Sequence, residues 1–184
     1  MENKAIGIIV GSIRKEAYTK KIANFLIKNQ PENYHFELIE IAELALYNQD
    51  YDQADEPENY SVFREKIKSK DGIIFITPEH NRSVPAAIKN ALDVGSRPYG
   101  QNVWNSKPAM IISSSIGGIG GFGANHHLRQ VLSFLNMPTL QQPEVYIAEV
   151  QNYFSEDGEL NNQEAVNFLL EALDCYLVFS SKFI

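Results

Sequence analysis

Cysteine is almost absent from this chain: its 184 residues contain one, Cys175. A single cysteine cannot form a disulfide within the chain, so we expect a protein of a reducing compartment, the cytoplasm. Cys175 lies among apolar residues at helical spacing with no basic residue nearby. That setting favours a packing role over a role as nucleophile.

An excess of positive charge is also lacking. Lys and Arg number 16 against 23 Asp and Glu, for a net charge of −7. A negative surface argues against binding to nucleic acid or to anionic lipid. No apolar run approaches the roughly 20 residues of a membrane span, and the N-terminus has no small-residue cleavage site. Internal repeats, low-complexity tracts and linkers are absent, so we expect one domain over residues 1–184.

Apolar runs typical of strands alternate with helical patterns. The expected strands are Ala5–Val10, Phe36–Ile41, Gly72–Thr77, Ala109–Ser113 and Val145–Val150. Helical spacing follows Tyr18, covers Arg64–Lys68 and Ala86–Val94, and recurs around Leu128 and Leu169. The first, third and fourth strands are continuously apolar, so both of their faces are buried. This pattern predicts an α/β/α sandwich with a five-stranded parallel sheet, in the flavodoxin-like order 2-1-3-4-5.

Ligands of such sheets bind beyond the carboxyl ends of the strands, which directs attention to three loops. The first reads GSIRKEAYT, residues 11–19. It offers the hydroxyls of Ser12 and Thr19, the guanidinium of Arg14 and the amides of a helix start, which together suit one phosphate. It lacks the GK[ST] ending of a triphosphate loop. The alternative is an ordinary turn in which Ser12 caps the helix.

The second loop reads TPEHNRSVP, residues 77–85. Its two prolines stiffen the backbone, and the Asn81 amide stands among them. A stiff array of backbone donors and acceptors would form hydrogen bonds with the edge of a flat heteroaromatic ring, either a flavin or a purine. A rigid turn into a helix is the alternative.

The third loop, SSSIGGIGGFG at residues 113–123, is built of small residues that let a ligand approach the backbone. It contains a G-x-G-x-x-G match, but a dinucleotide fingerprint follows the first strand of its unit, and this one follows the fourth. We therefore disfavour that interpretation. His126 and His127 are adjacent and would point about 100° apart on a helix, so we predict no metal site. The Gly-x-Ser-x-Gly elbow of a serine hydrolase is absent.

Taken together, the loops resemble those of the NADPH-dependent FMN reductase family, which includes bacterial quinone, chromate and azo-dye reductases. The family patterns are G-S-x-R-x-x-S-x-N/T and P-E-Y-N-x-S-x-P-x-x-L-K-N-A-x-D. This chain has GSIRKEAYT, PEHNRSVPAAIKNALD and SSSIGGIGG in the same order. The resemblance implies bound FMN, with NADPH or NADH as co-substrate.

The resemblance also implies the residues that hold FMN. They are Ser12, Arg14, Tyr18, Thr19, Pro78, Glu79, His80, Asn81, Ser114, Ser115, Gly117 and Gly118. Two positions depart from the family: Ala17 replaces a serine of the phosphate loop, and His80 replaces the tyrosine of P-E-Y-N. We expect phosphate binding to depend more on Arg14 as a result.

The implied reaction is ping-pong transfer from NAD(P)H through FMN to a small-molecule acceptor: a quinone, an azo compound, a flavin or an oxidised metal ion. Because the flavin carries the chemistry, no catalytic side chain is expected. A homodimer or a dimer of dimers is implied, and Arg97 is our candidate for a contact with the nicotinamide or the partner subunit. The alternatives are an electron carrier of the flavodoxin type, without its own NAD(P)H site, and a flavin-free binding module.

Overall fold

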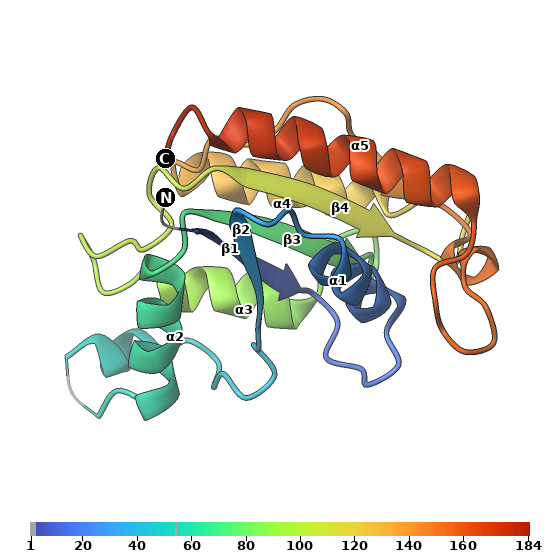
Figure 1. The fold of residues 1–184 in the computed structure, drawn as a ribbon. Coiled ribbons are helices and arrows are strands. Elements are labelled where there is room, and N and C mark those ends of the chain that lie inside the picture. Colours follow the sequence, from blue (N-terminus) through green and yellow to red (C-terminus); the bar gives the residue numbers. More distant parts are fainter. Residues whose placement is uncertain (1–2, 54) are drawn as a thin grey trace.

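Five parallel strands form one sheet in the order β2-β1-β3-β4-β5, as the sequence predicts. The structure is a computed structural model and describes residues 3–53 and 55–184. The strands are β1 (Lys4–Val10), β2 (Tyr34–Ile39), β3 (Gly72–Pro78), β4 (Ala109–Ser114) and β5 (Val145–Ile147). In Figure 1 the arrows of β1, β3 and β4 point the same way, so the loops that follow them gather at one edge.

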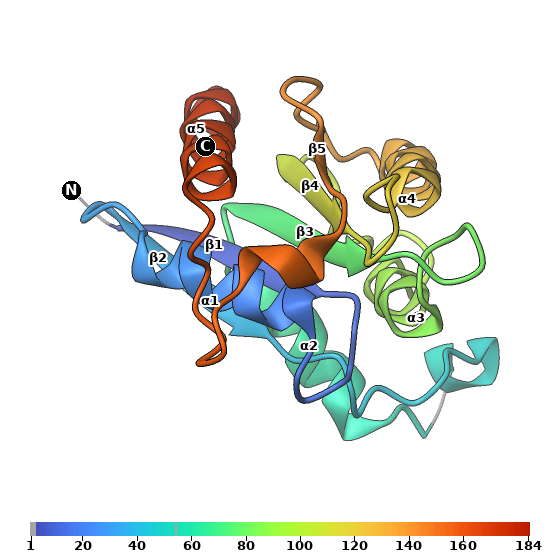
Figure 2. The ribbon, with the colours of Figure 1, turned by 90° about the vertical axis from the view of Figure 1, so that its right-hand side faces the viewer.

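The helices form a layer on each face of the sheet. They are α1 (Tyr18–Lys28), α2 (Glu58–Lys68), α3 (Ala86–Gly95), α4 (Phe122–Phe134) and α5 (Gln163–Ser180), with short 3-10 helices η1 (Gln49–Asp52) and η2 (Val150–Tyr153). One core packs α1 and α5 against the sheet, and the other packs α2, α3 and α4. Figure 2 shows α5 and α4 on opposite sides of β4. The flavodoxin-like three-layer sandwich is confirmed.

The central strands are buried on both faces because alternate residues enter different cores. In β3, Ile74 and Ile76 join the core of α1 and α5, whereas Ile73 and Phe75 join the other. All four side chains are fully buried. Cys175 is half-buried against the first core and is a free thiol, in agreement with its predicted packing role.

Two strands differ from their predicted bounds by more than one residue. The edge strand β2 begins and ends two residues earlier than predicted, because its first residues, Tyr34 and His35, are not buried and do not belong to an apolar run. Its predicted end, Ile41, is buried in the α2 core beyond the strand. β5 ends at Ile147, since Glu149 has a left-handed backbone (φ 47°) and Val150 begins η2.

Lys70 crosses β1 to reach Glu37 on β2, and Gly7 makes the crossing possible. A Cβ on Gly7 would lie 2.7 Å from Ile39 Cδ1, 2.9 Å from Ile73 Cδ1 and 3.2 Å from Lys70 Cγ. The Lys70 side chain is 7% exposed, and its ammonium group donates to the Glu37 carboxylate. This hydrogen bond lowers the pKa of Glu37, although burial opposes the shift.

We expect Lys70→Met to lower the free energy of unfolding at neutral pH by about 1 kcal/mol, a small value because Glu37 is partly exposed. A carboxyl whose pKa falls on folding stabilises above its unfolded pKa, and this contribution is lost as the pH falls through the folded pKa. The difference between native protein and variant should therefore shrink at about pH 3. Urea unfolding followed by circular dichroism at both pH values measures it. An equal difference at the two values would contradict the assignment.

Across the described residues, 3–53 and 55–184, we find no helix with the length and apolar character that a membrane crossing requires.

Candidate functional site

A cleft of about 270 Å³ opens at the carboxyl ends of β1, β3 and β4. Its lining residues are Ser12, Arg14, Ala17, Tyr18, Thr19, Pro78, Glu79, His80, Ser114, Ser115, Ile116 and Val150. The structure thus brings residues of all three predicted loops to one place. It does not bring Asn81, Gly117, Gly118 or Arg97 to the cleft lining.

The first loop turns sharply at Gly11. Its N–H donates to Ile76 O at 2.8 Å, and a Cβ there would lie 2.9 Å from Thr77 Oγ1. Only glycine lets the loop pack this closely on β3. The residue that caps α1 is Ala17, which has no side-chain cap, so the alternative in which Ser12 caps the helix is wrong.

The amino end of α1 presents unused donors to the cleft. Among the described residues, none accepts a hydrogen bond from the backbone N–H of Tyr18 or Thr19. The Thr19 side chain is 1% exposed, and its Oγ1 has no hydrogen-bond partner within the described chain. Leaving a buried hydroxyl unpaired costs free energy, and Thr19 lines the cleft, so this hydroxyl suits an acceptor bound there. With the exposed Arg14 beside them, these groups fit a phosphate.

The second loop is a tight turn. His80 and Ser83 exchange backbone hydrogen bonds of 2.9 Å in both directions, and the two residues between them, Asn81 and Arg82, have φ values of 50° and 65°. Two consecutive positive φ values define a turn of the I′ kind, in which asparagine is favoured. Asn81 therefore shapes the turn, while His80, which is exposed, lines the cleft.

The third loop is held by the segment that follows β5. Ser115 N donates to Ile147 O at 3.0 Å, and Val150 N donates to Ser115 O at 3.1 Å. These hydrogen bonds hold the buried Val150 at the wall of the cleft, which Ile116 also lines. The sequence interpretation missed both apolar residues, since neither has chemistry that marks a binding site.

The glycine-rich match serves the turn into α4. Gly120 and Gly121 have φ values of 60° and 78°, and a Cβ on Gly120 would lie 2.8 Å from Tyr146. Both glycines are thus required by backbone conformation or packing, which agrees with our rejection of a dinucleotide fingerprint. Gly117 and Gly118 are exposed, and a Cβ on Gly118 would meet no protein atom within 4 Å.

Asn90, from the K-N-A-x-D part of the second motif, has a structural task. Its Oδ1 accepts from Tyr47 N at 2.8 Å, and its Nδ2 donates to Leu44 O and Ala45 O at 3.2 and 2.9 Å. It is 8% exposed and fastens the segment after β2 to α3. The motif therefore encodes the scaffold of the cleft as well as its lining.

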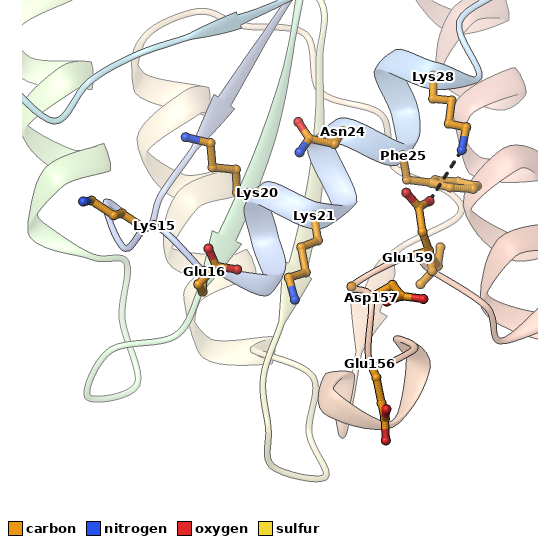
Figure 3. A pocket seen from close by; sticks show the side chains of 12 residues that line it. Lys15, Glu16, Lys20, Lys21, Asn24, Phe25, Lys28, Glu156, Asp157 and Glu159 are labelled. Carbon is orange, nitrogen blue, oxygen red and sulfur yellow. Dashed lines mark ion pairs between the residues drawn. The ribbon is translucent and has the colours of Figure 1, made fainter.

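A second hollow, of about 400 Å³, lies between α1 and the 156–160 segment. Figure 3 shows Lys15, Lys20 and Lys21 on one side and Glu156 and Asp157 on the other. Lys28 and Glu159 form an ion pair of 3.5 Å across it. Since both signs of charge line this groove, it has no preference for an anion, and we place no function there.

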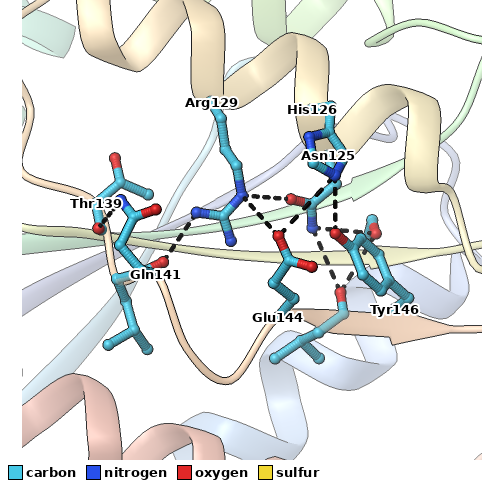
Figure 4. A network of polar contacts seen from close by, with 10 residues as sticks. Asn125, His126, Arg129, Thr139, Gln141, Glu144 and Tyr146 are labelled. Carbon is cyan, nitrogen blue, oxygen red and sulfur yellow. Dashed lines mark hydrogen bonds and ion pairs between the residues drawn. The ribbon is translucent and has the colours of Figure 1, made fainter.

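A polar network joins α4 to β5 (Figure 4). Arg129 Nε donates to Asn125 Oδ1 at 3.0 Å, and the Tyr146 hydroxyl lies 3.0 Å from His126 Nε2. Burial, and then a hydrogen bond with Glu144, raises the pKa of Tyr146 to about 12. His127 turns to Ser83 instead, with Nδ1 2.9 Å from its Oγ. Among the residues that the structure describes, no three His, Cys, Asp or Glu side chains are grouped to hold a metal.

Arg97 follows the carboxyl end of α3, whereas the second loop precedes the amino end of the same helix. The helix therefore separates it from the cleft of its own chain. A contact between Arg97 and a nicotinamide or a partner subunit stays a prediction.

Comparison with known proteins decides the family. A sequence model of the NADPH-dependent FMN reductase family matches residues 5–152. The chain belongs to this family. A quinone reductase of Pseudomonas putida is 48% identical over 159 residues, which cover 86% of each chain. A 2-hydroxy-1,4-benzoquinone reductase of a Burkholderia species is 39% identical over 171 residues, 93% of each chain. The structure of FerB, a flavoenzyme NAD(P)H:(acceptor) oxidoreductase from Paracoccus denitrificans, matches with a TM-score of 0.91 and 35% identity, covering 98% of both chains.

This FMN reductase family member is therefore an oxidoreductase, and its cofactors are FMN and NAD(P)H, as the resemblance implied. Membership in a family of reductases also removes the two alternatives, a carrier without an NAD(P)H site and a flavin-free module.

Proposed function

We propose that FMN binds in the cleft, with its phosphate held by Ser12, Arg14, Thr19 and the amino end of α1. Its ring would lie between the second loop, at Pro78, Glu79 and His80, and the third loop, at Ser114 and Ser115. Tyr18 would border the same site, and Asn81, Gly117 and Gly118 would support its rim. The observation that carries the proposal is the buried Thr19 hydroxyl, which has no partner among the described residues and lines the cleft.

We propose that the reaction is ping-pong reduction of a quinone by NAD(P)H. Bound FMN would supply the redox chemistry, hydride transfer between NAD(P)H and a second substrate, and the residues of the three loops would hold it in place. Ile116, 70% exposed, and Val150 add apolar surface for a flat ring. The names of the relatives favour a quinone over an azo compound, a free flavin or an oxidised metal ion.

The protein side of the reaction is binding and orientation. Water can reach the open cleft and protonate the reduced acceptor, so no acid or base residue is required. We further propose a cytoplasmic enzyme with one domain per chain, assembled as a homodimer or a dimer of dimers. Tyr99 and Phe134, 92% and 90% exposed, offer apolar surface for a partner subunit at the end of the molecule where Arg97 lies.

The first test is the visible spectrum. We expect the purified protein to be yellow, with an absorbance maximum at about 450 nm from bound FMN. NADPH or NADH added without oxygen should bleach this absorbance, and a quinone added afterwards should restore it. The separate steps test the ping-pong order and identify the preferred nicotinamide. A colourless protein that gains no absorbance with added FMN would overturn the proposal, and bleaching only in the presence of both substrates would overturn the order.

A further inference from the structure

The Glu79 carboxylate is bonded to the amino end of α4. The side chain is 9% exposed, and its Oε2 accepts a hydrogen bond from Ala124 N at 3.1 Å. Ala124 is in the first turn of α4, where backbone N–H groups have no partner within the helix. The other carboxylate oxygen, Oε1, lies 3.3 Å from Nη1 of Arg82, which is itself exposed. Negative charge at this end of a helix is also favoured by the helix dipole.

Two more contacts join the same turn to the same helix. A Cβ on Gly123 would lie 2.7 Å from Arg82 O and 2.9 Å from Glu79 Oε2, so the turn packs directly on the α4 backbone. One turn further along, His127 Nδ1 lies 2.9 Å from Ser83 Oγ. The turn after β3 is therefore attached to α4 at three points, of which the Glu79 carboxylate is the charged and nearly buried one.

These contacts couple two walls of the cleft. The 79–83 turn carries His80 on one wall, and α4 begins where the 113–121 loop of the opposite wall ends. We propose that Glu79 is a positioning residue: it holds the turn against α4 and so sets the spacing between the two walls. This inference rests on the proposed binding of FMN in the cleft. Glu79 then acts on FMN through the walls, and its carboxylate does not have to contact the ligand.

The main test compares Glu79→Ala with Glu79→Gln. Alanine removes the acceptor of the Ala124 N–H. The loosened turn would then hold the FMN-binding conformation only part of the time, and the apparent affinity for FMN falls with the fraction of molecules in that conformation. We expect the FMN dissociation constant of the Ala variant to rise about tenfold, and that of the Gln variant, which keeps an oxygen acceptor, to stay within about twofold. Fluorescence titration of the FMN-free protein measures both.

A second readout needs no FMN. Amide hydrogen exchange of Ala124 reports its bond to Glu79 directly, because it has no other acceptor among the described residues. In the FMN-free protein we expect this amide to exchange at least about tenfold faster in Glu79→Ala than in the native chain. The Gln variant should retain slow exchange.

Two variants of neighbouring residues complete the design. Arg82→Gln removes the exposed ion-pair partner of Glu79 and should leave FMN affinity within about twofold. Gly123→Ala keeps Glu79 but forces the turn away from α4, so it should reproduce the affinity loss even if Glu79→Ala fails to fold.

The possible outcomes are distinguishable. Equal weakening in the Ala and Gln variants would mean that the charge itself contacts the ligand, and would overturn the positioning role. Native affinity in Glu79→Ala together with fast Ala124 exchange would overturn it too, since the bond would then not set the cleft. Failure of the native protein to bind FMN would instead overturn the proposed function on which the inference rests.

Discussion

Arg14→Ala is expected to raise the dissociation constant for FMN by about 10- to 100-fold, the range for a lost hydrogen bond to a charged group. Arg14 stands in the first loop with no ion-pair partner among the described residues, and it lines the cleft next to the unpaired Thr19 hydroxyl. Its guanidinium can meet a phosphate with two parallel hydrogen bonds. Because Ala17 replaces the family's serine, no hydroxyl at that position can compensate. Titration of the FMN-free protein by flavin fluorescence measures the change.

Two controls make this prediction specific. Lys15→Ala removes the same charge one position away, from a side chain that lines the neighbouring grooves and not the cleft, and should change FMN affinity less than about threefold. Riboflavin, which has no phosphate, should bind the native protein and Arg14→Ala equally well. If Lys15→Ala lost as much FMN affinity as Arg14→Ala, Arg14 would act only through its long-range charge. If Arg14→Ala lost as much affinity for riboflavin as for FMN, Arg14 would contact the ring and not the phosphate.

The sequence predicts the central sheet well for a physical reason. Strands buried on both faces are apolar at nearly every position. The apolar runs Ala5–Val10 and Gly72–Thr77 therefore match β1 and β3 to within one residue at each end. An edge strand is only partly buried, so the exposed and half-buried residues that begin β2, Tyr34 and His35, lie outside the apolar run that predicts the strand. The end of β5 depends on the backbone of Glu149, which carries no signal in the sequence.

The same distinction applies to the cleft. Ser12, Arg14 and Thr19 belong to one local turn with anion-binding chemistry, and the structure places them together. Val150 is an ordinary core residue by type, and it reaches the cleft only through a hydrogen bond between distant segments. Glu79 lines the cleft, and its carboxylate also accepts a hydrogen bond from an amide 45 positions away, a contact that the motif does not indicate. Which neighbour a polar group meets across the fold is decided by tertiary packing, and short motifs do not encode it.

Trp104→Ala is expected to destabilise the protein by about 4 kcal/mol, within the range for removing a buried aromatic side chain. Trp104 is the one tryptophan of the sequence and is fully buried. Its ring lies 6.0 Å, between centroids, from those of both Phe63 and Phe75, and its Nε1 donates to Leu92 O at 3.0 Å. Alanine would leave a cavity between α2, α3 and β3. Urea unfolding followed by circular dichroism measures the loss without depending on tryptophan emission.

Three further variants test whether the loss in Trp104→Ala comes from the packing of the indole ring. Trp104→Phe keeps most of the ring and should cost about half as much. Tyr99→Ala, in the same segment but 92% exposed, should change the free energy of unfolding by less than about 0.5 kcal/mol in a monomeric state. Gly95→Ala should approach the cost of the tryptophan deletion, since its Cβ would come 2.5 Å from the indole nitrogen. If Gly95→Ala were neutral while Trp104→Ala was severe, the indole would not be held as tightly against α3 as its contacts indicate. In that case the position of α3, which begins at the cleft, would depend mainly on Asn90 and its three hydrogen bonds.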